Sequence, residues 1–559
     1  MTTQTAEKRN RQIARSTLVV MAAFAIAKII SLAQTIIIAR VFGVGREWDT
    51  FVTANSLPEL IFTLISGGAL AHAFIPIFSG YLARDDKPGA WKLTSHVINT
   101  VFAATAVVSI IVFFTAPWWV AHVVAPGFDV AAQQQTADLM RILLISTLIF
   151  SVSGISMGIL QSHNHFLLPA IAPIMFDLGI LFGAGFLIKP FGVRGIAYGA
   201  VLGAALHFAV QVPGLIHYRA RWSAEMGWRD PMLWKVLRLM LPRVVGLGLF
   251  SLNFLLMNNI ASRLGEGSVS ALSWGWRLMQ IPETLIGTAM GTVIFPTLAA
   301  LSDRGDETGK REAMSGALRF ILIATIPSAV GLILIGQPVI TLLEGGAFDT
   351  AASVLVYGTL RFFALGLVVH SALEVVARSF YADKDTLTPL WAAAGGAIIN
   401  FVLAYALSNV ASVEHNNYLH RMLIANFPNF GYMGTVGTIG NIGMLALANS
   451  AGVAFEVLTL LWILRRRWHG ANESLLAQTF IKAIAASLVM GLVIVIISTL
   501  WHGIGLGNRG TIFTVIEVGV MVVVGGLAFL ITAYLLKMHE LQMLVNMVLR
   551  RKTLTEAVA

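Results

Sequence analysis

The chain has no cysteine among its 559 residues, and only 12% of the residues are charged. The lack of cysteine excludes disulfides, thiol chemistry and cysteine metal sites. Soluble domains carry about 25% charged residues, so this composition, with 57% hydrophobic residues, indicates an integral membrane protein. The sequence also lacks HExxH, GxSxG, an aspartate pair at protease spacing and an ATP-binding P-loop. It therefore favours a protein that is not an enzyme, needs no cofactor and uses an ion, voltage or substrate gradient.

Long apolar runs dominate what is present, and each is long enough for a transmembrane helix of about 20 residues. The predicted fold class is an all-α polytopic membrane protein with fourteen transmembrane helices, in which Pro58, Pro282 and Pro327 are predicted bend points. The spans lie near residues 16–41, 50–80, 93–123, 139–160, 167–188, 194–217, 236–262, 270–300, 318–342, 353–381, 388–409, 433–464, 479–501 and 512–536.

The distribution of Lys and Arg predicts how these spans are oriented. With the N-terminus in the cytoplasm, inner segments hold 25 of the 38 basic residues and outer loops hold 7. Because positive residues favour the cytoplasmic side, both termini are expected to be cytoplasmic, in a plasma or inner membrane. The basic N-terminus has no small-residue cleavage site and is interpreted as a cytoplasmic tail. Orientation thus explains the net charge of +10, and no nucleic-acid partner is expected.

An internal repeat is visible in two pairs of segments. Residues 57–86 resemble residues 281–306, and residues 162–171 resemble residues 382–391. The number of residues that separates 162–171 from 382–391 also separates Pro76 of the first segment from Pro296 of its copy. Six spans separate the copies, so they have the same orientation and predict two parallel six-helix repeats followed by helices 13 and 14. The predicted domains are 1–218 (tail and helices 1–6), 219–235 (cytoplasmic linker), 236–466 (helices 7–12) and 467–559 (helices 13–14 and tail).

Parallel six-helix halves are typical of alternating-access transporters that carry their site at the interface between the halves. Ionisable groups inside a bilayer are costly and indicate function. Lys28, Glu59, Arg277 and Glu283 lie in predicted helices 1, 2 and 8, where they are candidates for one shared cavity. A purely structural role, with the glutamates bracing the bends, is the alternative. Fixed cations in a cavity suit an anionic substrate, because Arg presents a planar fork to phosphate oxygens.

Three segments carry a specific resemblance: residues 36–81, "RLMQIPETLIGTAMGTVIFPTLA" (277–299) and "YADKDTLTP" (381–389). They resemble the MurJ (MviN) family of lipid II flippases, in the superfamily of multidrug and oligosaccharidyl-lipid exporters. The resemblance covers the twelve-helix core. It implies two lobes rocking around a cationic cavity, a groove for the lipid tail at helices 13 and 14, and movement of a polyprenyl-diphosphate-linked cell-wall precursor to the outer leaflet.

The resemblance also places residues. The family's basic residue early in helix 1 falls at Lys28, its acidic residue after FGxG at Asp49, and its helix 8 Arg at Arg277. Gln34 and Thr35 stand where the family commonly has an Arg-Asp pair. The family's helix 2 Arg is replaced by Phe62 or Thr63, and Trp276 stands where an Asp often precedes the helix 8 Arg. Lys28 and Arg277 are therefore the residues expected to meet a diphosphate.

Coupling to Na⁺ or H⁺ is left open by the sequence. Some relatives hold sodium between helices 7 and 11, where Asn253, Asn258 and Asn400 are candidate ligands without a carboxylate. The insertion at 412–433 predicts either an interfacial helix or a partner-binding loop.

Three functional hypotheses follow. The first is a monomeric flippase whose partners are a lipid-linked anionic glycolipid and membrane lipids, with lipid II or another lipid-linked oligosaccharide as substrate. The second is an ion-coupled exporter of small amphipathic cations, with Glu59, Glu283 and Asp177 as working residues. The third is a scaffold that keeps the fold without the cavity.

Overall fold

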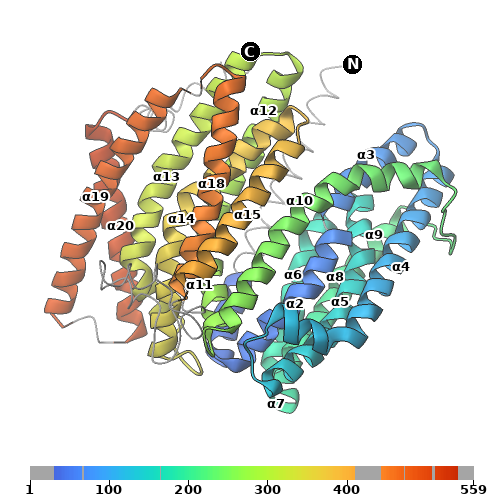
Figure 1. Ribbon diagram of the computed structural model, residues 1–559, viewed down its shortest axis with the longest axis horizontal. Coiled ribbons are helices and arrows are strands. Elements are labelled where there is room, and N and C mark those ends of the chain that lie inside the picture. The colour runs from blue at the N-terminus through green and yellow to red at the C-terminus, as the bar shows by residue number, and fades with distance from the viewer. Residues whose placement is uncertain are drawn as a thin grey trace. The chain divides into compact units, whose positions relative to one another are not determined.

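The computed structural model describes residues 30–65, 68–163, 165–408, 442–470, 472–505 and 510–538. The regular elements of this part are helices (Figure 1). Eleven of them are long and apolar enough to cross a membrane, and a bent pair supplies a twelfth candidate. The chain is therefore an all-helical, multi-pass membrane protein. It divides into two compact units, Met1–Ser270 with Gly346–Phe348 (unit 1) and Ala271–Gly345 with Asp349–Ala559 (unit 2).

Unit 1 is organised around α5, which packs against α2, α3, α4 and α8, while α6 pairs with α8. Its core contains Phe78, Trp91 and Ile159, all buried. The helices of unit 1 after the short apolar helix Ile30–Phe42 are α2 (Arg46–Ile65), α3 (Gly68–Ala83), α4 (Lys87–Trp119), α5 (Val130–Ser162), α6 (Leu167–Phe182), α7 (Ile188–Phe191), α8 (Arg194–Ala209), α9 (Val212–His217) and α10 (Pro231–Ser262), with π-helical turns η1 (Val120–Val124) and η2 (Gly183–Leu187).

The predicted linker 219–235 is a loop that is tied to α4 and ends sooner than expected. Asn99 Nδ2 donates to the carbonyl oxygens of Ser223 and Glu225 at 2.7 and 2.8 Å. Asp230 caps α10 by accepting a hydrogen bond from Met232 N, so this helix begins at Pro231. It packs on α2 and α3 and bends by 43° between its segments Pro231–Leu241 and Gly246–Ser262. Pro242 lies at this bend, which was not among the predicted ones.

Glycine lets α6 and α8 approach each other at backbone distance. A Cβ on Gly203 would lie 2.5 Å from the Phe176 carbonyl oxygen, and one on Gly199 would lie 2.7 Å from the Gly179 carbonyl oxygen. Helices in membranes associate largely through such close packing, because lipid supplies no hydrophobic drive between them. The run "YGAVLGAAL" at 198–206 is thus a packing face.

We expect Gly199→Ala to lower the thermal unfolding midpoint of the purified protein. The new methyl group would meet backbone atoms, which cannot rotate away, at a cost of about 1–3 kcal/mol. Gly185→Ala is the matched control, since a Cβ there meets nothing within 4 Å. Equal midpoints for the two variants, measured by scanning fluorimetry in detergent, would refute this role of Gly199.

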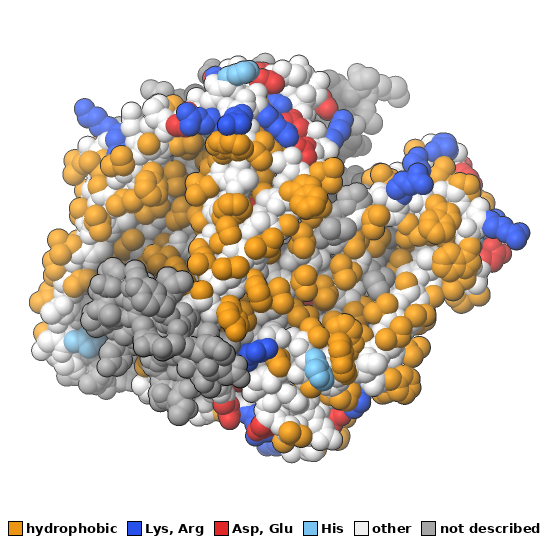
Figure 2. All heavy atoms as spheres, viewed as in Figure 1, with side chains coloured by type: hydrophobic (Ala, Val, Ile, Leu, Met, Phe, Trp, Pro, Cys, Tyr) orange, Lys and Arg blue, Asp and Glu red, His pale blue; other side chains and the backbone are white. Residues whose placement is uncertain are grey.

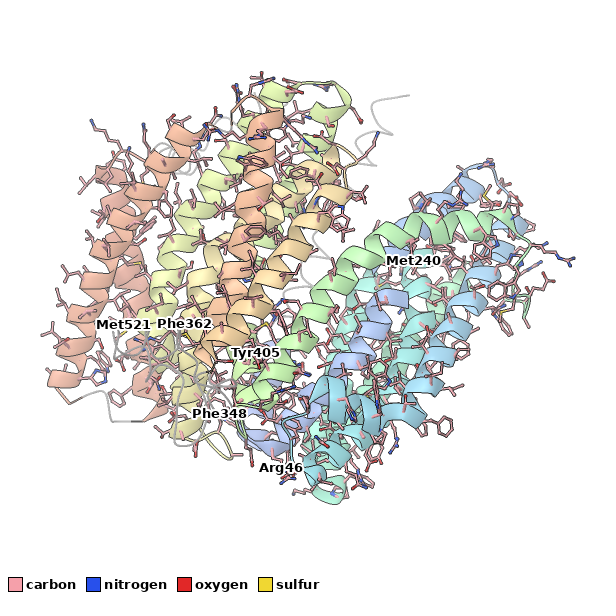
Figure 3. All side chains as sticks on the ribbon, viewed as in Figure 1. Arg46, Met240, Phe348, Phe362, Tyr405 and Met521 are labelled. Atoms are coloured by element: carbon pink, nitrogen blue, oxygen red, sulfur yellow. The ribbon has the colours of Figure 1, made fainter. Side chains whose placement is uncertain are left out.

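Unit 2 is organised around α14, which packs against α12, α13 and α18, while α15 pairs with α18. Helices α19 and α20 lie against each other and against α13 (Figure 1). Met521 on α20 is buried with Met490 and Phe529 in the apolar core between α13, α19 and α20 (Figure 3). The helices of unit 2 are α11 (Ser268–Glu283, whose first turn belongs to unit 1), α12 (Ala289–Asp303), α13 (Glu307–Thr341), α14 (Thr350–Ala382), α15 (Leu387–Leu407), α18 (Gly443–Arg467), α19 (Glu473–Gly503) and α20 (Thr511–Leu535), with the π-helical turn η3 (Thr284–Thr288).

Helix starts recur between the units at the offset that the sequence repeat predicts. The same spacing separates the first residues of α4 and α13, of α5 and α14, and of α6 and α15. The caps recur as well. Asp86 accepts a hydrogen bond from Gly89 N at 2.9 Å, and Asp306 accepts one from Gly309 N at 2.8 Å. An aspartate at this position satisfies an amide that the helix itself leaves unpaired.

The apolar side chains on the surface form the band that a bilayer requires. Figure 2 shows them covering the helices, with Lys and Arg gathered toward the helix ends. Phe114 and Trp391 expose 75% and 74% of their area. Such exposure would be a liability in water and is normal for a surface that faces lipid.

Candidate functional site

Asp49, in the first turn of α2, is buried with 2% of its area exposed. One carboxylate oxygen accepts a hydrogen bond from Gly267 N at 2.6 Å. The other accepts from Ser270 N at 2.6 Å and from Ser270 Oγ at 2.5 Å. These donors precede or begin α11, so one carboxylate fastens the starts of two helices that are far apart in the sequence. In this conformation, the carboxylate of Asp49 is fully engaged by the protein.

Other contacts in unit 1 gather around the same end. Arg46 N donates to Glu266 Oε1 at 3.1 Å, and the Arg46 guanidinium pairs with Asp129 at 2.5 Å (Figure 3). Ala347 N donates to the Arg40 carbonyl oxygen at 2.8 Å. Each contact joins segments that lie between predicted spans on the side opposite the termini. The structure thus ties four predicted outer connections together in one cluster of hydrogen bonds.

The remaining predicted residues of unit 1 are placed differently. Gln34 is buried on the helix Ile30–Phe42, whereas Glu59 is exposed on α2 and accepts a hydrogen bond from Asn55 Nδ2 at 3.1 Å. Asp177, a residue of the exporter hypothesis, lies half-buried on α6. Lys28 lies outside the described residues.

In unit 2, Arg277 is exposed on α11, and its guanidinium carbon lies 5.9 Å from the centre of the Trp274 ring. Trp276, at the position where the resemblance would place Asp, packs edge-on against His370 and Phe363 with 5.3 Å between ring centres. Position 276 therefore carries an aromatic ring packed against α14 where the resemblance would place an acid.

Glu283 ends α11 and adjoins the π-helical turn η3, and it is half-buried in a polar cluster. Its carboxylate accepts hydrogen bonds from Thr284 Oγ1 at 3.5 Å and from Thr288 Oγ1 at 3.4 Å. It also interacts electrostatically with Glu374 and Arg378 of α14, which form an ion pair along their helix. A π-helical turn loosens the backbone ladder and is frequent at functional sites. This cluster brings together charged side chains of α11 and α14 that all lie within predicted spans.

Within the described residues, no group of three or more His, Cys, Asp or Glu side chains is placed to hold a metal ion. Asn253 lies on α10 of unit 1, and Asn400 is buried on α15 of unit 2. Asn258 Nδ2 donates to Ser56 Oγ at 2.9 Å. The insertion at 412–433 lies outside the described residues.

The "YADKDTLTP" segment forms a polar junction between α14 and α15. Asp383 accepts hydrogen bonds from Ser302 Oγ at 2.6 Å and from the largely buried Lys310 at 2.8 Å. Burial alone would raise the pKa of Asp385, but hydrogen bonds from Thr388 N and Oγ1 and the contact with Arg467 hold this pKa below its usual value. This motif therefore connects α12, α13, α15 and α18 within unit 2.

We expect Asp385→Asn to destabilise the protein at neutral pH and to lose this effect in acid. A carboxyl group with a lowered folded pKa contributes stability above its unfolded pKa, about 3.9, and loses it as pH falls through the folded value. The difference in unfolding midpoint between wild type and variant should thus close below about pH 4. Asp303→Asn, whose side chain is 74% exposed, is the control and should show no such gap. A gap that is constant with pH would contradict this assignment.

Comparison with known proteins identifies the family. Residues 38–509 match the family described as "MurJ: Lipid II flippase MurJ". The chain is 29% identical over 389 residues to "Lipid II flippase MurJ" of Burkholderia cenocepacia (68% of this chain, 75% of that protein), and 26% identical over 520 residues to "Probable lipid II flippase MurJ" of Rhizobium tropici (91% and 92%).

Solved structures share the fold. "Lipid II flippase MurJ, inward closed conformation" superposes with a TM-score of 0.72 at 22% identity, covering 93% of this chain and 98% of that one. An inward-facing multidrug resistance MATE family transporter of the MOP superfamily gives 0.63 at 15% identity, covering 79% and 94%. The family match over most of the length decides between these two kinds of transporter: the chain belongs to the MurJ family of lipid II flippases and is a transporter, not an enzyme.

Proposed function

We propose that the chain moves a polyprenyl-diphosphate-linked cell-wall precursor, lipid II or a close relative, from the inner to the outer leaflet by alternating access. The family match over residues 38–509 carries this proposal. The protein acts as a monomer in the inner membrane with both termini in the cytoplasm, an orientation supported by the excess of basic residues in one set of loops. The proposal includes no cofactor, and Asn253 and Asn400 are the candidate ligands for a coupling Na⁺ ion.

We further propose fourteen spans arranged as two parallel six-helix lobes, 1–218 and 236–466, joined by the linker 219–235 and followed by helices 13 and 14 in 467–559. The recurrence of three helix starts and of an aspartate cap at one constant offset supports the repeat. The short apolar helices Ile30–Phe42 and Phe74–Ala83 overlap the two predicted spans, 16–41 and 50–80, that are not among the long candidates.

Within this scheme, Lys28 and Arg277 hold the diphosphate, while Gln34, Glu59 and Glu283 line the same path. Arg277 supports this role because it is an ionisable side chain within a predicted span, where such groups are costly and indicate function. Its side chain is also exposed on α11. Asp49 has a structural role in this scheme and does not bind the diphosphate. Its hydrogen bonds to Gly267 and Ser270 hold the outer connections together, and outward opening requires that they break.

The test is complementation. A bacterium depleted of its own flippase should regain outer-leaflet lipid II when it expresses this chain, and the Lys28→Ala variant should not restore it. Immunoblots of membrane fractions control for expression. Failure to restore lipid II by the well-folded wild-type chain, together with proton-dependent dye efflux, would replace the flippase by the exporter of amphipathic cations. Failure in both assays would leave the scaffold.

A further inference from the structure

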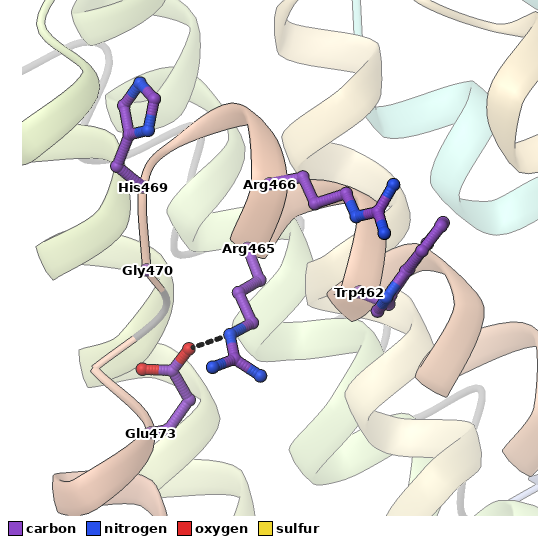
Figure 4. Close-up of a pocket in the computed structure, with 6 residues that line it drawn as sticks. All are labelled: Trp462, Arg465, Arg466, His469, Gly470 and Glu473. Carbon is purple, nitrogen blue, oxygen red and sulfur yellow. Dashed lines mark ion pairs between the residues drawn. The ribbon is translucent and has the colours of Figure 1, made fainter.

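A hollow of about 530 Å³ lies where α18 ends and α19 begins in unit 2 (Figure 4). The proposed transport path does not use it. Its lining combines two guanidinium groups, an imidazole and one carboxylate around an aromatic ring and a glycine: Trp462, Arg465, Arg466, His469, Gly470 and Glu473.

The two arginines that line the hollow differ in how they are held. Arg465 Nε pairs with Glu473 Oε1 at 2.9 Å, and both side chains are at least half exposed, so water weakens this pair. The guanidinium carbon of Arg466 lies 3.8 Å from the centre of the Trp462 ring. Within the described part of the chain, Arg466 makes no hydrogen bond or ion pair. A ring face orients this guanidinium while leaving its N–H donors available to an acceptor.

A third guanidinium reaches the same place from α13. A Cβ on Gly470 would lie 3.7 Å from Arg311 Nη1, which also donates to the Trp468 carbonyl oxygen at 3.4 Å. Gly470 has φ +135°, a backbone conformation that favours glycine, and the missing side chain keeps this edge of the hollow open. The Arg311 Nε atom is buried without a hydrogen-bond partner among the described residues. Two arginines thus line a hollow that contains one acid, and a third lies beside its Gly470 edge.

One face of α18 leads from the apolar part of the helix to this hollow. Leu458, Trp462 and Arg466 follow each other at intervals of four residues, which places them along one side of the helix. Leu458 and Trp462 expose 65% and 51% of their area. An exposed aliphatic side chain, then an indole, then a guanidinium is the order in which a phospholipid presents its acyl chain, glycerol region and phosphate.

We propose that the α18–α19 turn binds the phosphate of an anionic phospholipid of the inner leaflet, with Arg465 and Arg466 as its main donors and Leu458 and Trp462 along its glycerol and acyl chain. The charge balance of the hollow selects an anion, and Arg binds phosphate oxygens with paired hydrogen bonds. The proposal rests on the proposed orientation, which places this turn on the cytoplasmic side, but not on the identity of the transported substrate.

Native mass spectrometry of the purified full chain in detergent, titrated with phosphatidylglycerol or phosphatidylcholine, tests the site. Wild-type protein should bind phosphatidylglycerol more tightly than phosphatidylcholine. The double variant Arg465→Gln with Arg466→Gln should lose at least about tenfold of the phosphatidylglycerol affinity. Glu473→Gln should instead gain about two- to fivefold, because it removes the competing carboxylate.

Two matched charge changes serve as controls. Arg304→Gln and Asp303→Asn alter exposed charges at the end of α12, which is also predicted to be cytoplasmic, and should change the affinity less than twofold. Unfolding midpoints near that of wild type confirm that the variants fold. If Arg304→Gln lowers the phosphatidylglycerol affinity as much as the double variant does, surface charge alone binds the lipid and the proposal fails. If glycerol 3-phosphate alone binds as tightly as the lipid, a soluble phosphate is the ligand and the lipid assignment is overturned. Flipping is not measured, so the result is separate from the complementation test.

Discussion

Replacing Asp49 with Ala should reduce lipid II flipping to the background of the depleted strain. The change leaves the buried N–H groups of Gly267 and Ser270 without their acceptor, at about 1–3 kcal/mol each. The starts of α2 and α11 then lose the carboxylate that joins them, and the outer connections lose three hydrogen bonds. The measurement is outer-leaflet lipid II in the complementation strain.

Glu47→Gln is the matched control, because Glu47 is an exposed acid in the same helical turn. A conformational readout separates opening from a lack of protein. The chain has no native cysteine, so Val44→Cys introduces a single thiol, next to Gly267. Its reaction with a membrane-impermeant maleimide should be faster in the Asp49→Ala background. Unchanged labelling together with normal flipping would show that the Asp49 contact does not hold this end closed.

Replacing Arg277 with Ala should lower the flipping rate by about 10- to 100-fold. A hydrogen bond to a charged group contributes about 1.5–3 kcal/mol, and the diphosphate loses such a partner. Arg277→Lys should fall between wild type and Ala, since the ammonium keeps the charge but not the planar fork. The rate is measured with fluorescent lipid II in proteoliposomes that contain equal amounts of protein.

Lys384→Gln is the control for this series, because it removes one positive charge from a side chain that is 86% exposed and remote from α11 in the sequence. It should flip at the wild-type rate. The same rate in Arg277→Ala would remove Arg277 from the substrate path. An equal loss in Arg277→Lys and Arg277→Ala would indicate that the fork, and not the charge, is the requirement.

The elements that could be predicted from sequence are those with a local cause. Apolar runs set the spans because a bilayer demands about 20 apolar residues per crossing. The Glu374–Arg378 ion pair also has a local cause, since a spacing of four residues places both side chains on one face of a helix. The bend near Pro242 also has a local cause visible in the sequence, a proline inside a long span, but it was not among the predicted bends.

Only part of the candidate site could be predicted from the sequence. Asp49 was singled out through the resemblance, but its partners Gly267 and Ser270 have no signature in sequence, because backbone amides are present at every residue. Glu283 was chosen for its charge, whereas its neighbours Glu374 and Arg378 come from another helix. Arg465 and Arg466 are, in sequence, only two of the basic residues that orient the chain, because the hollow that they line forms where α18 meets α19 in the fold.

The sequence by itself determined that this protein is a multi-pass helical membrane protein, how its helices repeat, and which family it resembles. The first two follow from composition and spacing, which act along the chain, and the resemblance follows from matching motifs. Only the tertiary structure decided which charged groups meet: the Asp49 carboxylate at the start of α11, the Glu283 cluster beside α14, and two arginines lining one hollow with Arg311 beside its edge. Contacts between residues far apart in sequence depend on how helices pack, and this information is not contained in any single segment.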